Sequence, residues 1–522
     1  MKKIIFISLT LIPFYLFGQK GQLTSVESGI EAGYITDSHI LLKENRYTFD
    51  DRISRFYIDS VGQHITLQLR GVTKDGKWLN NKGYLCQFDI PTQQLLWSNK
   101  MNYQTTMLLQ NKDWMVLTEN FKSINLDPLT GKELWTIKKD IYYINAKTGI
   151  ALGYDFMNGF SSKPYLLRAF DRQSGQELWN RKIDREYTWN GTLHLNDSTM
   201  IIISSGLHEV NLYTGKGWDY NAITGLNNYT RMALTNVAGI GLGLLTGAFV
   251  VSTGHDIVTN IDSNVWSDST KLYFASKEEL VCLDYAGNKL WQTALPKNKM
   301  AKSLLFVRDS TIILVNEGFG DMGYRPVTVG QPFIAGYSCN NGAQKFFAFI
   351  DIPKAIIEDC KQEKDTMYLL TKQYLISYSL KDGSEIKKSA MLMKDKEEFY
   401  SFMDKRQIYF PMKDSIYQSF SQSDSTSLGI YTTKGKMLSV NRQFSIDKQL
   451  DSASVYVAYQ KRNGITFIAN GKHTLVINDK GAVLAKIKAS DKARLSGDIL
   501  YDTDNNTLIT IDLKALFERY NQ

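Results

Sequence analysis

Histidine and cysteine, two residue types that often carry acid–base or metal chemistry, number only six and four in this 522-residue sequence, and they lack the spacing that such sites need. No two histidines are three or four residues apart, the separation that places two imidazoles on one helix face around a metal ion. The sequence also lacks a Gly-x-Ser-x-Gly elbow, a His-Glu-x-x-His motif and a phosphate-binding Gly-Lys-Ser/Thr loop. The histidines are His39, His64, His194, His208, His255 and His473.

His194 and His208 flank one predicted strand pair, and we interpret both as ordinary strand or loop residues. We therefore predict no catalytic, cofactor-binding or metal-binding residue.

The spacing of the four cysteines favours isolated thiols. No Cys-x-x-Cys pair is present, so neither a redox pair nor a zinc site is indicated. Cys86 and Cys282 each stand just before an aspartate of the repeat described below, and we expect both to be buried thiols on strands. For Cys339 and Cys360, a disulfide and two free thiols both remain open.

The net charge is low for a chain of this length. Lysine and arginine number 61 against 53 aspartate and glutamate residues, which gives a formal charge of +8. Nucleic-acid-binding proteins normally gather Lys and Arg on one face. No such cluster is visible along the sequence, so we expect no nucleic-acid partner.

The N-terminus has the pattern of a secretory signal. Two lysines precede an apolar run from Ile4 to Phe17, which ends at the small residue Gly18. A basic start, a short apolar run and a small residue are the parts of a signal peptide, and the run is short for a membrane span. We predict export to the periplasm or the exterior, without a lipid anchor because no cysteine occurs before Cys86.

One short pattern recurs along the chain. The stretches NLDPLTGKELW, ending at Trp135, and AFDRQSGQELW, ending at Trp179, share an Asp, a Gly four residues later and a Trp four residues after that. Related copies end at Trp97 and Trp291, and a shorter one ends at Trp218. A period of about 40 residues is typical of propellers and solenoids. Weaker copies keep the glycine and lose the tryptophan, at Gly342, Gly383, Gly435 and Gly481.

The pattern has a physical explanation as a tight hairpin followed by an anchor. Glycine accepts a positive φ without steric cost, and the Asp carboxylate accepts hydrogen bonds from N–H groups of its own turn. The Trp then begins the next strand, where its ring packs against the neighbouring unit. We predict structural turn and docking roles for Asp89, Trp97, Asp127, Gly131, Trp135, Asp171, Gly175, Trp179, Gly215, Trp218, Asp284, Gly287 and Trp291.

A second pattern precedes these turns. Near Asn196, Ser267, Arg308 and Lys364, an Asp and a hydroxyl residue stand before an alternating or β-branched apolar run, which predicts a turn and then a strand. Units of a few short antiparallel strands, repeated every ~40 to 55 residues, are what propeller blades require. We predict an all-β fold, a β-propeller of eight blades with seven as the alternative, each blade having four antiparallel strands.

The stretch AFDRQSGQELW resembles the repeat of the pyrroloquinoline-quinone-like β-propellers, Ala-x-Asp-x-x-Thr-Gly-x-x-x-Trp. Ala169, Asp171, Gly175 and Trp179 match it, with Ser174 at the Thr position, and the preceding copy matches it as closely. The resemblance extends over about residues 85–485 and implies the propeller fold.

The family includes quinone-dependent alcohol dehydrogenases and also non-catalytic scaffolds such as the outer-membrane barrel-assembly propeller. Its enzymes usually carry two adjacent cysteines over the cofactor and a Glu/Asn/Asp set that holds calcium. In this chain no two cysteines are adjacent, and no Asp-rich loop has calcium-ligand spacing. The resemblance is therefore closer to the non-catalytic branch and implies no cofactor, although the lipid-anchor cysteine of the assembly scaffold is absent.

Residues 236–254, NVAGIGLGLLTGAFVVSTG, depart from the β pattern. Gly239, Gly243 and Gly247 have a four-residue spacing that lets helices approach closely. A membrane span is excluded, because the strands on both sides must join one ring on one side of a membrane. An apolar insertion over about 225–258 leaves three interpretations: packing on a ring face or in the channel, a monotopic membrane or partner contact, or a glycine-rich strand.

A second long connection, residues 316–337, carries Arg325 and several aromatic side chains. Long loops on a rigid ring are common recognition sites. The candidate interaction residues are therefore Arg325 here and, in the apolar insertion, Phe249 with the three glycines named above.

These observations give the following organisation: a signal peptide over 1–18, an N-terminal lead-in over 19–44, a propeller over 45–515, and a C-terminal tail over 516–522. An N-terminal strand is expected to complete the final blade, because a ring must close. The favoured function is an exported, non-catalytic protein-binding or scaffold module of the bacterial envelope, with protein partners on one propeller face. The alternative is a quinone-dependent dehydrogenase or another enzyme with a site over the central channel.

Overall fold

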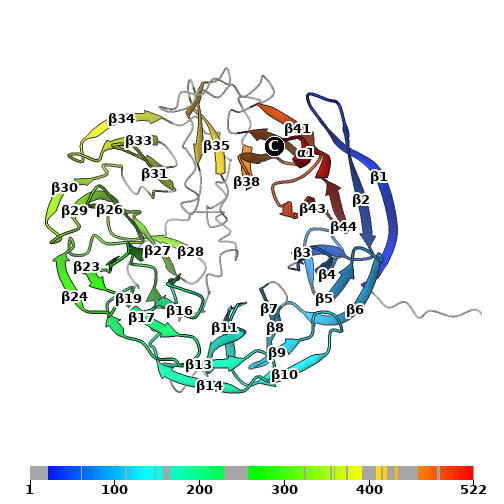
Figure 1. The fold of residues 1–522 in the computed structure, drawn as a ribbon, viewed down its shortest axis with the longest axis horizontal. Coiled ribbons are helices and arrows are strands. Elements are labelled where there is room, and N and C mark those ends of the chain that lie inside the picture. Colours follow the sequence, from blue (N-terminus) through cyan, green and yellow to red (C-terminus); the bar gives the residue numbers. More distant parts are fainter. Residues whose placement is uncertain are drawn as a thin grey trace, which may run out of the picture.

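The chain folds into a ring of antiparallel β-sheets (Figure 1). The computed structural model describes residues 21–59, 61–111, 114–145, 147–156, 165–227, 257–322, 325–352, 356–357, 359–371, 374–390, 407–412, 415–419, 430–432, 456–478 and 482–520. The signal peptide expected over residues 1–18 and most of the apolar insertion lie outside this range.

Seven separate sheets of four strands follow one another along the chain. Where Figure 1 labels both strands of a sheet, the first strand lies nearer the centre of the ring and the last lies at the rim. In chain order, sheets 1 to 7 are β3 (Arg52–Ile58), β4 (His64–Val72), β5 (Leu79–Asp89), β6 (Gln94–Asn102); β7 (Thr106–Asn111), β8 (Trp114–Glu119), β9 (Lys122–Leu126), β10 (Glu133–Ile137); β11 (Asp140–Asn145), β12 (Ile150–Tyr154), β13 (Leu166–Asp171), β14 (Glu177–Lys182); β15 (Gly191–His194), β16 (Thr199–Ile203), β17 (Gly206–Asn211), β18 (Asp219–Asn221); β21 (Trp266–Ser267), β22 (Lys271–Ala275), β23 (Glu279–Asp284), β24 (Lys289–Ala294); β25 (Ser303–Arg308), β26 (Thr311–Asn316), β29 (Phe333–Ser338), β30 (Gln344–Phe349); and β31 (Asp359–Glu363), β32 (Thr366–Leu370), β33 (Tyr374–Ser379), β34 (Glu385–Ala390).

A twelve-stranded sheet, the closing sheet, joins the two ends of the chain. In spatial order it contains β37 (Ile430–Thr432), β36 (Ser415–Ser419), β35 (Gln407–Met412), β38 (Tyr456–Arg462), β39 (Ile465–Asn470), β40 (His473–Asn478), β41 (Val483–Ile487), β1 (Leu23–Ile35), β2 (Leu41–Phe49), β44 (Thr507–Asp512), β43 (Ile499–Asp504) and β42 (Arg494–Ser496). The all-β propeller fold with four-stranded antiparallel sheets is confirmed. The closing sheet holds more strands than one blade needs, so the count of eight blades stays a prediction.

Two short ribbons complete the set of strands. They are β19 (Leu226–Asn227) with β20 (Ile257–Val258), and β27 (Phe319–Met322) with β28 (Arg325–Thr328). The first ribbon is formed by the two ends of the apolar insertion, and the second lies within the connection between β26 and β29.

The core is divided into layers between neighbouring sheets. The second and third strands are buried on both faces, as in β12, where all five residues are buried, because another sheet packs on each side. The rim strands instead alternate between exposed and half-buried residues, as in β14 and β24. One apolar cluster joins sheets 3 and 4, another joins sheets 5 and 6, and a third joins the closing sheet to sheet 1.

Strands from opposite ends of the chain close the ring. β2 pairs with β44 in antiparallel register from Glu44↔Ile511 to Thr48↔Thr507. This confirms the expectation that an N-terminal strand completes the last unit and covers its edge. β1 continues beyond it, pairing with β2 and, at residues 33–35, with β41. Residues 23–44 therefore belong to the ring, and the expected lead-in before residue 45 is corrected.

The expected C-terminal tail is part of the core. Helix α1 (Lys514–Tyr520) buries Leu516 and Phe517 in the apolar cluster of the closing sheet. The guanidinium of Arg462 covers the Phe517 ring at 4.3 Å from its centroid. Within the described residues, no helix has both the length and the apolar character that crossing a bilayer requires.

All four cysteines are buried and free, so Cys339 and Cys360 do not form a disulfide. Cys86 on β5 and Cys282 on β23 lie on strands as expected. The carbonyl of Cys339 instead accepts a hydrogen bond from the indole of Trp291 in the preceding sheet, at 3.0 Å.

Replacing Phe517 by alanine removes an aromatic ring that is only 3% exposed. We expect Phe517→Ala to lower the free energy of unfolding by about 3–5 kcal/mol, because it leaves a cavity in the closing sheet. A urea titration followed by tryptophan fluorescence measures this loss. Glu518→Ala, at an exposed position of the same helix, serves as the control, and equal midpoints for the two variants would contradict a core role for α1.

Candidate functional site

The repeat aspartates close their own turns with hydrogen bonds. The Asp127 carboxylate accepts from the backbone N–H groups two and three residues later, at 2.8 and 3.1 Å. Asp171 and Asp284 act in a similar way, and Asp89 accepts from the N–H three residues later at 2.9 Å. The N–H of Ser174 holds the pKa of Asp171 below its ordinary value. These carboxylates are occupied within their turns.

Each repeat tryptophan packs against the glycine of the next sheet's turn. The indole of Trp135 lies over Gly175, where an added Cβ would be 2.8 Å from the ring, and its Nε1–H donates to the carbonyl of Arg172 at 2.6 Å. The other pairs, each with its acceptor carbonyl, are Trp97 with Gly131 and Pro128 (2.7 Å), Trp179 with Gly215 and Leu212 (2.7 Å), Trp218 with Gly287 and Tyr285 (3.0 Å), and Trp291 with Gly342 and Cys339 (3.0 Å).

The glycine therefore meets two requirements at once. Its φ is positive, +69° at Gly175, and its missing side chain leaves room for the ring. The next unit shows a variation, because Phe346 takes the place of the indole over Gly383. In the first turn Gln93 stands at the glycine position with φ +57° and is exposed. Sequence reasoning predicted the docking role but not that its partner is the following glycine.

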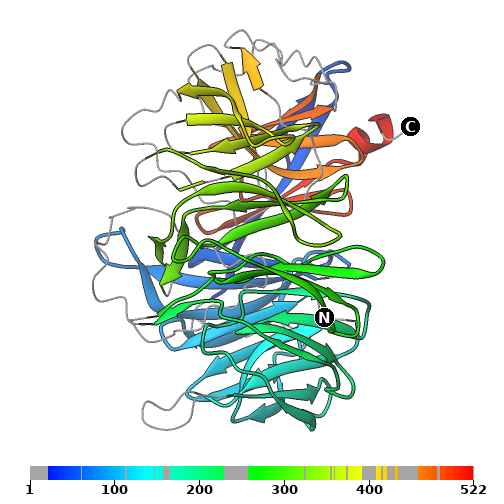
Figure 2. The same cartoon turned by 90° about the vertical axis from the view of Figure 1, so that its left-hand side faces the viewer.

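The two faces of the ring carry different connections. In an antiparallel four-stranded sheet, the first and third turns lie at one end, and the second turn and the link to the next sheet lie at the other. The Asp–Gly turns are third turns and define the short-turn face. The long-connection face carries the β4–β5 hairpin and both short ribbons, and α1 lies on the opposite side (Figure 2).

On the long-connection face, the two ribbons are joined at their base. The backbones of Thr259 and Asp321 exchange two hydrogen bonds, at 2.8 and 3.0 Å. The side chain of Asn260 donates to the Asp321 carboxylate. Gly320 packs so closely against Val258 that an added Cβ would be 2.7 Å from it. The end of the apolar insertion is therefore fixed against the β27–β28 hairpin.

Two buried aspartates, Asp262 and Asp321, lie at this junction. The Asp262 carboxylate accepts a hydrogen bond from the side chain of Asn190 at 2.7 Å, and the Asp262 carbonyl accepts one from the Ser303 N–H at 2.8 Å. Asp262 therefore connects the residues at which the first strands of sheets 4, 5 and 6 begin. Burial raises its pKa to about 8, with Asp321 adding to the rise and Lys302 opposing it.

Burial also raises the pKa of Asp321. Within the described part of the chain, its Oδ1 has no hydrogen-bond partner. Sequence reasoning missed this polar junction. Asn190, Asp262, Lys302 and Asp321 are widely separated in the chain and form no motif, so only the ring brings them together.

The two histidines singled out from the sequence face different partners. Nε2 of His194 lies 3.0 Å from the Tyr143 hydroxyl, and burial lowers the pKa of His194. Both ring nitrogens of His208 are engaged, with the Asp219 carboxylate at 2.6 Å and the Ser204 carbonyl at 2.7 Å. The structure does not bring the two imidazoles together.

Of the candidate interaction residues, only Arg325 is described. It is exposed and begins β28, on the long-connection face. Gly239, Gly243, Gly247 and Phe249 lie outside the described residues.

The described residues do not fit the quinone cofactor and calcium ion of quinone-dependent dehydrogenases. Every cysteine is buried in an apolar cluster between or within sheets, so no pair of them caps a cofactor. Across the described segments, no three His, Cys, Asp or Glu side chains lie close enough together to hold a metal ion.

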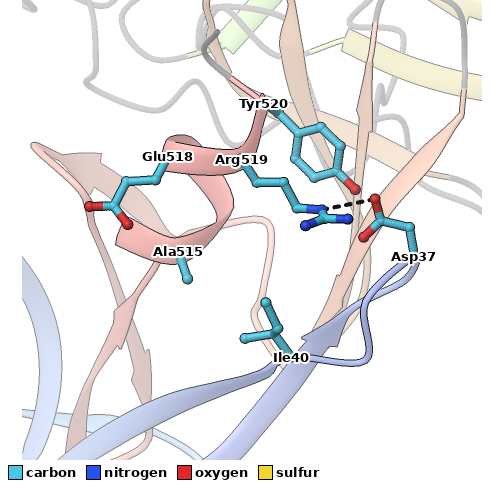
Figure 3. Close-up of a pocket in the computed structure, with 6 residues that line it drawn as sticks. All are labelled: Asp37, Ile40, Ala515, Glu518, Arg519 and Tyr520. Carbon is cyan, nitrogen blue, oxygen red and sulfur yellow. Dashed lines mark hydrogen bonds and ion pairs between the residues drawn. The ribbon is translucent and has the colours of Figure 1, made fainter.

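An open depression lies beside α1, on the other side of the ring (Figure 3). It is lined by Asp37, Ile40, Ala515, Glu518, Arg519 and Tyr520. Nε of Arg519 donates to the Asp37 carboxylate at 2.9 Å, and the Tyr520 hydroxyl holds the pKa of Asp37 below its ordinary value. These contacts fasten the β1–β2 turn to α1, so we interpret the depression as part of the ring closure.

Gly175→Ala tests the contact between indole and glycine. The alanine has to adopt φ near +69° and also displaces the Trp135 ring, so we expect a loss of stability of more than about 1–3 kcal/mol. Gly76→Ala is the matched control, because Gly76 has φ +70° and nothing lies within 4 Å of its added Cβ. Equal urea midpoints for the two variants would show that the indole contact contributes nothing.

Asp262→Asn tests the buried carboxyl. The pKa of Asp262 is about 8 in the folded protein and about 3.9 in the unfolded chain. At a pH between these two values, the folded protein keeps a proton that the unfolded chain has lost. The stability of the natural protein therefore falls as pH rises through this window. We expect Asp262→Asn to gain at least about 1 kcal/mol relative to the natural protein between pH ~5 and pH ~8, measured by urea unfolding. A difference independent of pH would contradict a buried neutral Asp262.

Comparison with known proteins supports the repeat assignment. A family model described as "Outer membrane protein assembly factor BamB" matches residues 68–267. No curated protein matches the sequence.

Similar solved structures include BamB from Moraxella catarrhalis (9% identity, 78% of this chain and 96% of that chain, TM-score 0.31) and a quinohemoprotein alcohol dehydrogenase from Pseudomonas putida (9% identity, 72% of this chain and 71% of that chain, TM-score 0.31). The matched segment contains four of the five repeat tryptophans, Trp97, Trp135, Trp179 and Trp218, and lies within the ring described above. The chain is a β-propeller, and its repeats over residues 68–267 match the family model of a pyrroloquinoline-quinone-like repeat protein.

Proposed function

We propose that this chain is an exported, non-catalytic β-propeller that acts as a protein-binding or scaffold module of the bacterial envelope. The observation that carries the proposal is an arc of exposed aromatic side chains on the long-connection face. Trp78 is 72% exposed and Phe121 is 65% exposed. They lie on the second turns of sheets 1 and 2.

The aromatic arc is held in place by its surroundings. Phe121 has φ +59°, a left-handed conformation that costs a bulky residue of order 1–3 kcal/mol. Its ring meets Phe156, on the second turn of sheet 3, edge to face with centroids 5.7 Å apart. Large aromatic side chains are enriched at the centres of protein interfaces, so partner binding explains why such residues are held in water at a strained position.

The rest of the architecture agrees with a binding role. The motif residues are used within turns and between sheets, which gives a rigid frame and leaves recognition to the connections. The family model that matches residues 68–267 carries the description of an outer membrane protein assembly factor. The basic start and apolar run of residues 1–18 favour export.

Site-specific cross-linking tests this proposal. A photoreactive residue at position 121 of the full chain is expected to capture a protein in living cells. The same residue at Leu178, which is 45% exposed on the rim strand β14, is the control and is expected to capture none. Trp78→Ala should weaken binding of the captured partner by at least about tenfold, the fall expected for an interface anchor.

The enzyme alternative predicts a different result. Tight binding of pyrroloquinoline quinone with calcium, together with dye-linked oxidation of alcohols or sugars, would overturn the non-catalytic proposal. Capture at position 178 equal to that at 121 would instead contradict the assignment of the binding face.

A further inference from the structure

Five basic residues lie on the β27–β28 hairpin and on two connections of sheet 5 at the same end of the ring. They come from three connections of sheets 5 and 6, which the sequence separates and the ring brings together. We call them the basic platform: Lys277, Lys297, Lys299, Lys302 and Arg325.

Two of the lysines contact the β27–β28 hairpin or the residues that follow it. Nζ of Lys299 donates to the Gln331 side chain at 3.0 Å. Nζ of Lys302 lies 5.2 Å from the centroid of the Phe319 ring. Both side chains are half-buried, whereas Lys297 and Arg325 are exposed.

The charge of the basic platform is not compensated. Within the described segments, none of its five cations lies within 4.0 Å of a carboxylate, whereas Arg181 and Arg308 elsewhere pair with Asp219 and Asp365. The connections that form the platform contain a single exposed carboxylate, Glu278.

The carboxyl groups below the basic platform are buried. Asp262 and Asp321 are 4% and 5% exposed, and burial raises the pKa of both. For Asp262 the pKa rises to about 8, so this carboxyl is largely protonated at neutral pH. Glu317, also below the platform, is 8% exposed and is thus shielded from a ligand that arrives from solvent.

We propose that the basic platform binds an acidic, extended segment of a partner protein. This inference rests on the proposed protein-binding function and identifies the chemistry of one contact. Charge complementarity selects an anionic ligand. A protein segment fits best, because the platform occupies one sector of the ring and exposes apolar rings, such as Phe349 at 42%, beside its cations. A flat bilayer would instead engage the whole face.

A defined peptide tests the inference on the full chain. The probe is a short fluorescent peptide of alternating Glu and Ala, and the control peptide has Gln in place of Glu. We expect the acidic peptide alone to bind and its affinity to fall as salt is raised. The double variant Lys297→Glu with Arg325→Glu is expected to weaken binding at least tenfold.

The matched control variant is Lys132→Glu with Lys216→Glu. These exposed lysines lie in the Asp–Gly turns of the short-turn face, and the change in net charge is the same. Binding should be unchanged in this variant. Equal weakening in both double variants, or no binding of the acidic peptide to the natural chain, overturns the inference.

Two further arms separate this inference from other possibilities. Tighter binding to anionic lipid vesicles or to an oligonucleotide than to the peptide, with the same loss in Lys297→Glu with Arg325→Glu, overturns the choice of a protein segment. If that variant loses the peptide but keeps the partner cross-linked at position 121, the basic platform is a second contact. If it keeps both, the platform assignment is wrong while the proposed function stands.

Discussion

The contact between an indole and the next glycine is the interaction on which this ring depends. Each sheet has two large faces to bury, and the tryptophan of one unit covers the glycine corner of the next while donating its N–H to a carbonyl there. Buried apolar area holds the sheets together, and the hydrogen bond fixes their relative position. The same few residues therefore determine both the turn within a sheet and the angle between sheets.

Repetition made much of this predictable from one sequence. Asp171, Gly175 and Trp179 differ in chemistry, so their common spacing identified a turn, a corner and an anchor without structural information. The partner of each anchor was less visible, because it belongs to the following copy. Where the repeat has drifted, as at Phe346 and Gly383, the packing survives while the sequence signal fades.

The polar junction and the basic platform could not be read from the sequence for a different reason. Asn190, Asp262 and Asp321 meet only because three successive sheets begin their inner strands at the same end of the ring. Ordinary loop residues such as Lys297 and Arg325 have no recognisable spacing. A low overall charge also conceals a local excess, such as the five cations of the basic platform.

The pairing of β2 with β44 has a consequence for biogenesis. β2 can pair with the adjacent β1 at once, but its other edge has no partner until nearly the entire polypeptide is available. The last step of folding therefore joins the most distant parts of the chain, which is slow. Until then two open edges invite pairing with other chains. A cell that produces this protein in quantity would benefit from a chaperone that shields those edges before the ring locks.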